Sequence, residues 1–145
     1  MKSKACIMTF RPFNIPAVYS DDMLARLSDE FDMLPYICSK DDFPALEGEL
    51  QKVEYIFSTW GMPALSEEEI RQYLPRLKAV FYAAGTVQQF ARPFIACGVD
   101  VFSAWAANAV PVAEVAASEI LLANKGFFRR EVKCRADWQN DDRER

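Results

Sequence analysis

Short apolar segments alternate with amphipathic segments along most of the chain. Within the apolar segments, apolar and polar side chains do not alternate regularly, which is typical of strands buried on both faces. Between them, apolar side chains recur at the three- and four-residue spacing of a helix. This pattern predicts five strands, at residues 5–10, 33–38, 55–58, 79–83 and 99–103.

Local signals mark the predicted helices. Ser20 is a favourable N-cap residue ahead of a first helix. Ser66 and Glu69 have the spacing of a capping box at the start of another. Further short helices are predicted at residues 43–53 and 90–97. Because parallel strands need crossover connections, and helices supply them, the alternation favours a parallel sheet covered on both faces. We therefore expect an α/β, flavodoxin-like three-layer domain over residues 1–107, with strand order 2-1-3-4-5.

A long helix is predicted at residues 111–130, where it would extend for about 30 Å. Its polar residues up to position 123 are only Glu114, Ser118 and Glu119. A helix that is apolar around most of its circumference must be buried on more than one side. We therefore expect residues 108–130 to pack against a second domain or subunit, although a crossover helix within one domain is an alternative.

Residues 131–145 are charged and mixed in sequence, and we interpret them as the start of a linker. Over the whole chain, 17 Lys and Arg residues against 21 Asp and Glu residues give a net charge of −4. No basic stripe is present, which argues against nucleic-acid binding. Glu114 and Glu119 interrupt the most apolar stretch, which argues against a membrane span.

The chain has no histidine, so it supplies no imidazole base and no histidine metal ligand. Its four cysteines, Cys6, Cys38, Cys97 and Cys134, are far apart and form no CxxC pair. That spacing predicts neither a zinc site nor a redox motif, and we expect no metal. Reduced, buried thiols and the lack of a signal peptide favour a cytoplasmic location.

Ligands of open α/β sheets bind beyond the carboxyl ends of the strands, which draws attention to three loops. They are residues 58–61, 83–86 and 103–108. Gly85 stands out, because a glycine there lets backbone N–H groups approach an anion closely. The alternative is that Gly85 only makes a tight turn.

Two segments carry a resemblance to a known family. They are LKAVFYAAGTV and ACGVDVFSAWAANAVPVAEVAASEILLANKGFFRR, and the second contains Asn108 followed by Val112, Ala113 and Glu114. Together they resemble the N-terminal region of the D-isomer-specific 2-hydroxyacid dehydrogenases, whereas residues 1–76 match only in their strand–helix layout. The resemblance implies a substrate-binding domain whose long helix crosses to a nicotinamide-binding domain and a dimer interface.

The resemblance also implies roles for individual residues. The backbone of Gly85 and Thr86 matches the loop that holds the substrate carboxylate, and Asn108 matches an asparagine near the substrate and the nicotinamide. Val112 matches an apolar residue that packs beside the nicotinamide. Trp60 would line the substrate pocket, or else belong to the core.

The sequence also departs from the family. The loop at residues 83–87 lacks the first glycine and the aspartate of the family's Gly-x-Gly-x-Asp pattern. No GxGxxG segment is present, and the family's catalytic arginine, glutamate and histidine have no counterpart, so we assign no catalytic residue in this chain. We therefore expect NAD or NADP to act only in an intact enzyme and not to bind this chain alone.

The predicted function is that of a fragment: the substrate domain of an oxidoreductase that interconverts 2-oxo and D-2-hydroxy carboxylates by hydride transfer. The isolated chain is expected to be inactive. We also expect a homodimer through the helix at residues 110–130. The alternative is a stand-alone flavodoxin-like binding or dimerisation module without catalysis.

Overall fold

The computed structural model describes residues 2–129, which divide into two units at the boundary between Asn108 and Ala109. The first unit is built around a five-stranded, all-parallel sheet in the order β2-β1-β3-β4-β5. This confirms the predicted α/β class, the parallel sheet and the strand order, and it is consistent with a flavodoxin-like fold. The strands are β1 (Lys4–Ile7), β2 (Asp32–Met33), β3 (Tyr55–Ser58), β4 (Ala79–Tyr82) and β5 (Asp100–Ser103).

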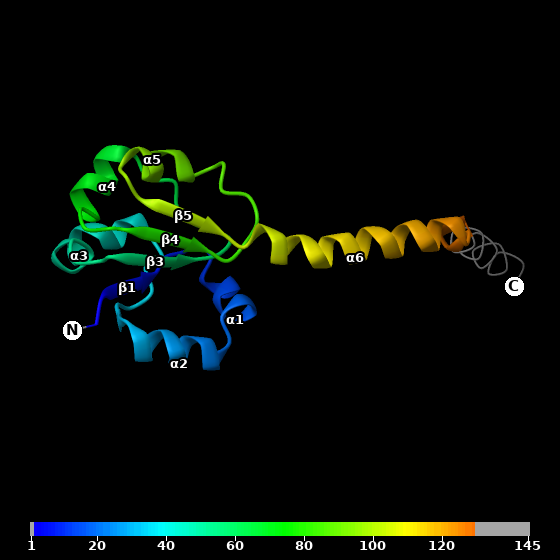
Figure 1. The fold of residues 1–145 in the computed structure, drawn as a ribbon, viewed down its shortest axis with the longest axis horizontal. Helices are drawn as coiled ribbons and strands as arrows, with labels where there is room; N and C mark the ends of the chain where they lie inside the picture. Colours follow the sequence, from blue (N-terminus) through cyan, green and yellow to red (C-terminus); the bar gives the residue numbers. More distant parts are fainter. Residues whose placement is uncertain (1, 130–145) are drawn as a thin grey trace, which may run out of the picture. The chain divides into compact units, whose positions relative to one another are not determined.

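Helices cover the sheet unequally (Figure 1). The step from β1 to β2 runs in one direction across the sheet, and the three later steps run in the other. Because such crossovers are right-handed, the first places its helices on one face and the others place theirs on the opposite face. The first face carries α1 (Ile15–Val18) and α2 (Asp21–Glu30), and the second carries α3 (Phe43–Leu50), α4 (Glu67–Tyr73) and α5 (Ala91–Ala96).

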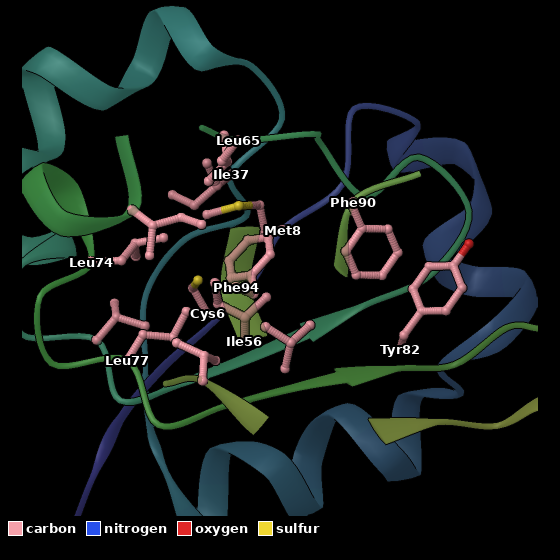
Figure 2. Close-up of a cluster of buried hydrophobic side chains, with 14 of the residues drawn as sticks. Cys6, Met8, Ile37, Ile56, Leu65, Leu74, Leu77, Tyr82, Phe90 and Phe94 are labelled. Carbon is pink, nitrogen blue, oxygen red and sulfur yellow. The ribbon is translucent and has the colours of Figure 1, made fainter. Parts of the chain in front are cut away.

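The main hydrophobic core lies between the sheet and the three helices α3, α4 and α5 (Figure 2). Met8, Ile56 and Val80 supply its sheet side, and Leu50 and Phe94 supply its helix side; all five are fully buried. A smaller cluster on the opposite face is centred on Ile7, Ile15 and Tyr19. The core is therefore concentrated on the side with three helices.

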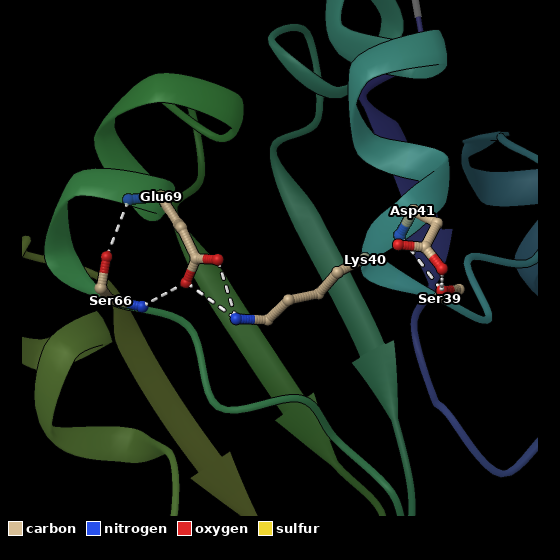
Figure 3. A network of polar contacts seen from close by, with 5 residues as sticks. All are labelled: Ser39, Lys40, Asp41, Ser66 and Glu69. Carbon is tan, nitrogen blue, oxygen red and sulfur yellow. Dashed lines mark hydrogen bonds and ion pairs between the residues drawn. The ribbon is translucent and has the colours of Figure 1, made fainter.

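An ion pair joins the segment just before α3 to the first turn of α4 (Figure 3). The Lys40 ammonium contacts the Glu69 carboxylate at 2.8 Å. Glu69 also accepts a hydrogen bond from the Ser66 N–H at 2.7 Å, and its own N–H donates to the Ser66 hydroxyl at 3.2 Å. This is the capping box predicted from the sequence, and it orders the first turn of α4.

Strand β2 is shorter than predicted, covering two residues instead of residues 33–38. Pro35 is the physical reason, because proline has no N–H to give to the ladder. Contact with β1 resumes at Ile37, whose N–H donates to the Ile7 carbonyl at 2.9 Å. Ile37 then forms an isolated bridge with Met8.

The long helix α6 covers Trp105–Asn124 and therefore begins six residues before the predicted start at Pro111. Pro111 lies inside the helix rather than at its first turn, which is why the sequence rule for helix starts placed it wrongly. The helix also ends at Asn124, six residues before the predicted end at residue 130, because Gly126 adopts a φ of 72°, a left-handed conformation that stops a helix. The predicted linker at 131–145 lies outside the described residues. By length and apolar composition alone α6 could cross a membrane, and none of its residues is buried.

Candidate functional site

Gly85 and Asn108 meet beyond the carboxyl ends of β4 and β5. A methyl group placed on Gly85 would lie 3.0 Å from Asn108 Nδ2 and 3.7 Å from its side-chain carbon. The distance of 3.0 Å is shorter than ordinary van der Waals contact. The Asn108 amide therefore fits here because residue 85 is a glycine and has no side chain. The two positions are 23 residues apart in the sequence, and the fold brings them together.

The backbone around Gly85 is fixed by a serine at the end of β5. The Ser103 hydroxyl donates a bond to the carbonyl of Ala84 at 3.1 Å or to that of Gly85 at 2.5 Å. Within residues 2–129, no protein acceptor takes the N–H of Gly85 or of Thr86. The loop therefore has the carbonyls of Ala84 and Gly85 engaged, whereas two adjacent N–H groups have no protein acceptor and can donate to a ligand.

Asn108 is positioned by the first turn of α6. Its N–H donates to the Ala104 carbonyl at 2.9 Å, directly after β5 ends at Ser103. The side chain is half-buried against Gly85. If the N–H groups of Gly85 and Thr86 hold a ligand, the Asn108 side-chain amide can donate a hydrogen bond to an oxygen of that ligand.

Trp60 follows β3, the strand beside β4, and is 44% exposed. Its carbonyl accepts a hydrogen bond from the Thr9 hydroxyl at 2.8 Å and another from the Asn14 amide at 3.3 Å. The next residue, Gly61, has φ of 98°, and a side chain there would meet Thr9 Oγ1 at 2.8 Å. The backbone at Trp60 is thus held firmly while its ring stays accessible, which is inconsistent with a fully buried core residue.

Val112 belongs to the second unit, where its side chain is 63% exposed. Within the first unit, the structure brings together Gly85 and Asn108, with Thr86 next along the loop and Trp60 at the end of the adjacent strand. Sequence reasoning missed two hydroxyl groups. They are Ser103, which holds the loop, and Thr59, whose buried Oγ1 has no hydrogen-bond partner among the described residues.

The titratable groups near these strand ends are not suited to proton transfer at neutral pH. Burial raises the pKa of Tyr19, whose hydroxyl donates to the Ser58 carbonyl at 2.9 Å, to about 12. Burial also raises the pKa of Tyr82 above its ordinary value. Over residues 2–129, no group of three or more metal-ligating side chains comes together. Among the described residues, the arrangement therefore offers hydrogen-bond donors at these strand ends, and the two tyrosines beside it stay protonated at neutral pH.

Comparison with protein-family models and with curated proteins finds no match to this chain.

Proposed function

We propose that this chain is the substrate-binding domain of an NAD(P)-dependent oxidoreductase that interconverts 2-oxo and D-2-hydroxy carboxylates by hydride transfer. The observation that carries the proposal is the close approach of the Asn108 amide to Gly85, beside two available backbone N–H donors. These donors and the amide suit an anionic group with a second oxygen next to it. A 2-oxo or 2-hydroxy carboxylate has that shape.

In this proposal the residues bind and orient the substrate. The N–H groups of Gly85 and Thr86 hold its carboxylate, the Asn108 amide donates to its 2-oxygen, and the Trp60 ring lines one wall of the pocket. Val112 packs beside the nicotinamide in the intact enzyme. Positioning of this kind lowers the barrier by fixing the reacting atoms in place.

The residues present do not form a dinucleotide site. The glycines of the whole chain, at positions 48, 61, 85, 98 and 126, nowhere have the GxGxxG spacing that admits a pyrophosphate. The nicotinamide cofactor, which supplies the hydride, would therefore be held by a separate nucleotide-binding domain. We expect the isolated chain to be silent, and NADH-dependent reduction of any 2-oxo acid by this chain alone would refute that expectation.

Further parts of the proposal concern partners and location. We place the protein in the cytoplasm, with a small 2-oxo or 2-hydroxy acid as its ligand and with no nucleic-acid or membrane partner. A homodimer through the helix at residues 110–130 is part of the proposal. It is supported by the large apolar side chains that α6 leaves exposed, among them Val115, Ile120 and Leu121.

Those exposed side chains also favour the alternative of a stand-alone flavodoxin-like binding or dimerisation module without catalysis. The two functions differ in what they require of Gly85. A dimerisation module needs no ligand at the carboxyl ends of β4 and β5, whereas a substrate domain does.

The test is an NMR titration of the full chain with pyruvate, comparing Gly85→Ala with Gly48→Ala. At position 48 an added methyl group meets nothing within 4 Å, so this variant is a matched control. We expect pyruvate to shift the amide signals of Gly85, Thr86 and Asn108 in the wild type and in Gly48→Ala. Gly85→Ala should reduce the affinity at least about tenfold, because Asn108 must move. Equal affinity in Gly85→Ala, or shifts confined to other residues, would contradict the proposal.

A further inference from the structure

The sheet face on the side of α1 and α2 carries a row of aromatic rings. Phe57, Phe81 and Phe102 are register partners on the adjacent strands β3, β4 and β5. Their rings stack in sequence, with centroids 5.4 Å and then 5.2 Å apart and interplanar angles of 17° and 12°. Phe31, which caps α2, packs edge-on against Phe57, and this places the row on the α2 side. We refer to Phe57, Phe81 and Phe102 as the aromatic row.

The row is partly buried at one end and open at the other. Phe57 packs against the cluster of Ile7, Ile15 and Tyr19, whereas Phe102 is 53% exposed. A groove lined by Phe31, Tyr55 and Phe81 among others runs beside it. Parallel sheets are normally covered on both faces, so among residues 2–129 the open end lacks the second layer that is usual in this architecture.

Helix α6 buries none of its residues, and one side of it carries small and branched apolar side chains that could pack against the aromatic row. Ala116, Ile120 and Ala123 lie on one side of it, opposite the polar stripe of Glu114, Ser118 and Lys125, since each residue advances about 100° around the axis. The small alanines leave room for bulky rings, and large residues pack best against small ones. Ile120 is itself 61% exposed.

We propose that, in a dimer of this chain, the α6 helix of each copy covers the aromatic row of the other copy. The inference rests on the proposed homodimer and names the surface that its helix occupies. The exchange is symmetric: each copy gives one helix and receives one, as a two-fold interface requires.

The surface area that each copy could bury favours this exchange over a contact through the sheet surface alone or the helix surface alone. Half-exposed Phe102 offers about 100 Å², and the partly exposed rings beside it raise the sheet surface to about 250 Å². One side of a helix about 30 Å long and 10 Å wide adds about 300 Å². A stable dimer buries about 800 Å² on each partner. Either surface alone falls far short of that figure. The two together bury about 550 Å² on each copy and about 1,100 Å² in all, which clears the figure of about 1,000 Å² expected of a specific interface.

The experiment is a complementation test by sedimentation equilibrium on the full chain. Phe102→Lys damages only the sheet surface, and Ile120→Lys damages only the helix surface. Both side chains are exposed, so we expect each variant to fold, which far-UV circular dichroism checks. Ile95→Lys, at a side chain on α5 that is also 61% exposed, is the matched control.

We expect Phe102→Lys and Ile120→Lys each to weaken the dimer at least about tenfold, and Ile95→Lys to leave it unchanged. An equimolar mixture of the two damaged variants should form a heterodimer tighter than either homodimer, because it retains one intact helix–sheet contact. Helix-to-helix pairing predicts no such recovery. In that case the heterodimer would pair one intact helix with the damaged helix of Ile120→Lys, and no intact contact would remain.

The outcomes separate this inference from the proposed function. Weakening by Ile120→Lys without any effect of Phe102→Lys, or a mixture that gains nothing, overturns the helix–sheet exchange and leaves the helix dimer standing. A wild-type chain that stays monomeric at every concentration overturns both the exchange and the dimer. None of these results affects the substrate site, which the pyruvate titration tests independently.

Discussion

Replacing Thr59 by valine should stabilise the protein, although the residue is completely buried. Thr59 follows β3, its relative exposure is 0%, and its Oγ1 has no hydrogen-bond partner among the described residues. A buried hydroxyl without a partner costs about 1–3 kcal/mol. Valine has nearly the same shape as threonine, so the substitution removes the polar atom without opening a cavity.

We expect Thr59→Val to raise the free energy of unfolding by about 1 kcal/mol, which corresponds to a rise in Tm of about 3 °C for a chain of this size. The matched control is Thr9→Val. Thr9 is equally buried, but its Oγ1 donates to the Trp60 carbonyl at 2.8 Å and accepts from the Arg11 N–H at 3.1 Å. That substitution should therefore destabilise by about 1–2 kcal/mol.

Urea denaturation followed by circular dichroism measures both changes, with the slope m checked for constancy. The reasoning is refuted if Thr59→Val destabilises the protein as much as Thr9→Val does. That result would mean that the Thr59 hydroxyl is satisfied and contributes to the fold.

Two further predictions concern buried titratable groups. Burial raises the pKa of Tyr19 to about 12, so the stability that the protonated Tyr19 hydroxyl contributes is complete below pH 10 and should be lost as the pH rises from about 10 to 12. Urea midpoints across that pH range measure this loss. The Tyr19→Phe variant should show a smaller change in midpoint over the same range. Burial raises the pKa of the Cys6 thiol to about 12, so iodoacetamide at pH 8 should label partly exposed Cys38 and Cys97 well before Cys6. Peptide mass spectrometry reads out the order, and equal labelling of Cys6 in the folded protein would show that its site opens.

Much of the fold could be predicted because its signals are local. Unbroken apolar segments marked the strands, and the Ser66–Glu69 capping box marked the start of α4, which the structure confirms. The strand order was predicted from the flavodoxin-like order of doubly wound parallel sheets, and the structure confirms it. Two errors occurred at prolines: Pro35 interrupts β2, and Pro111 lies within α6 although proline favours the first turn of a helix. A third occurred at Gly126, which ends the long helix early.

The site was predictable only in part, because its contacts join distant segments. Gly85 and Asn108 were both candidates, but no sequence pattern places the Asn108 amide against the glycine. Ser103 and Thr59 lay within the candidate loops, but the sequence does not show whether a hydroxyl finds a hydrogen-bond partner or which one it finds. The aromatic row likewise depends on register between three strands, which single apolar segments do not specify.

Our main proposal is that this chain is one domain of a 2-hydroxyacid dehydrogenase. The most direct test is to determine the coding sequence downstream of the codon for Arg145. The account predicts a continuing reading frame that encodes a GxGxxG segment between a strand and a helix, followed by an arginine, a glutamate and a histidine. A stop codon at that point, or a continuing frame without the glycine-rich segment, would contradict it and favour the stand-alone binding module.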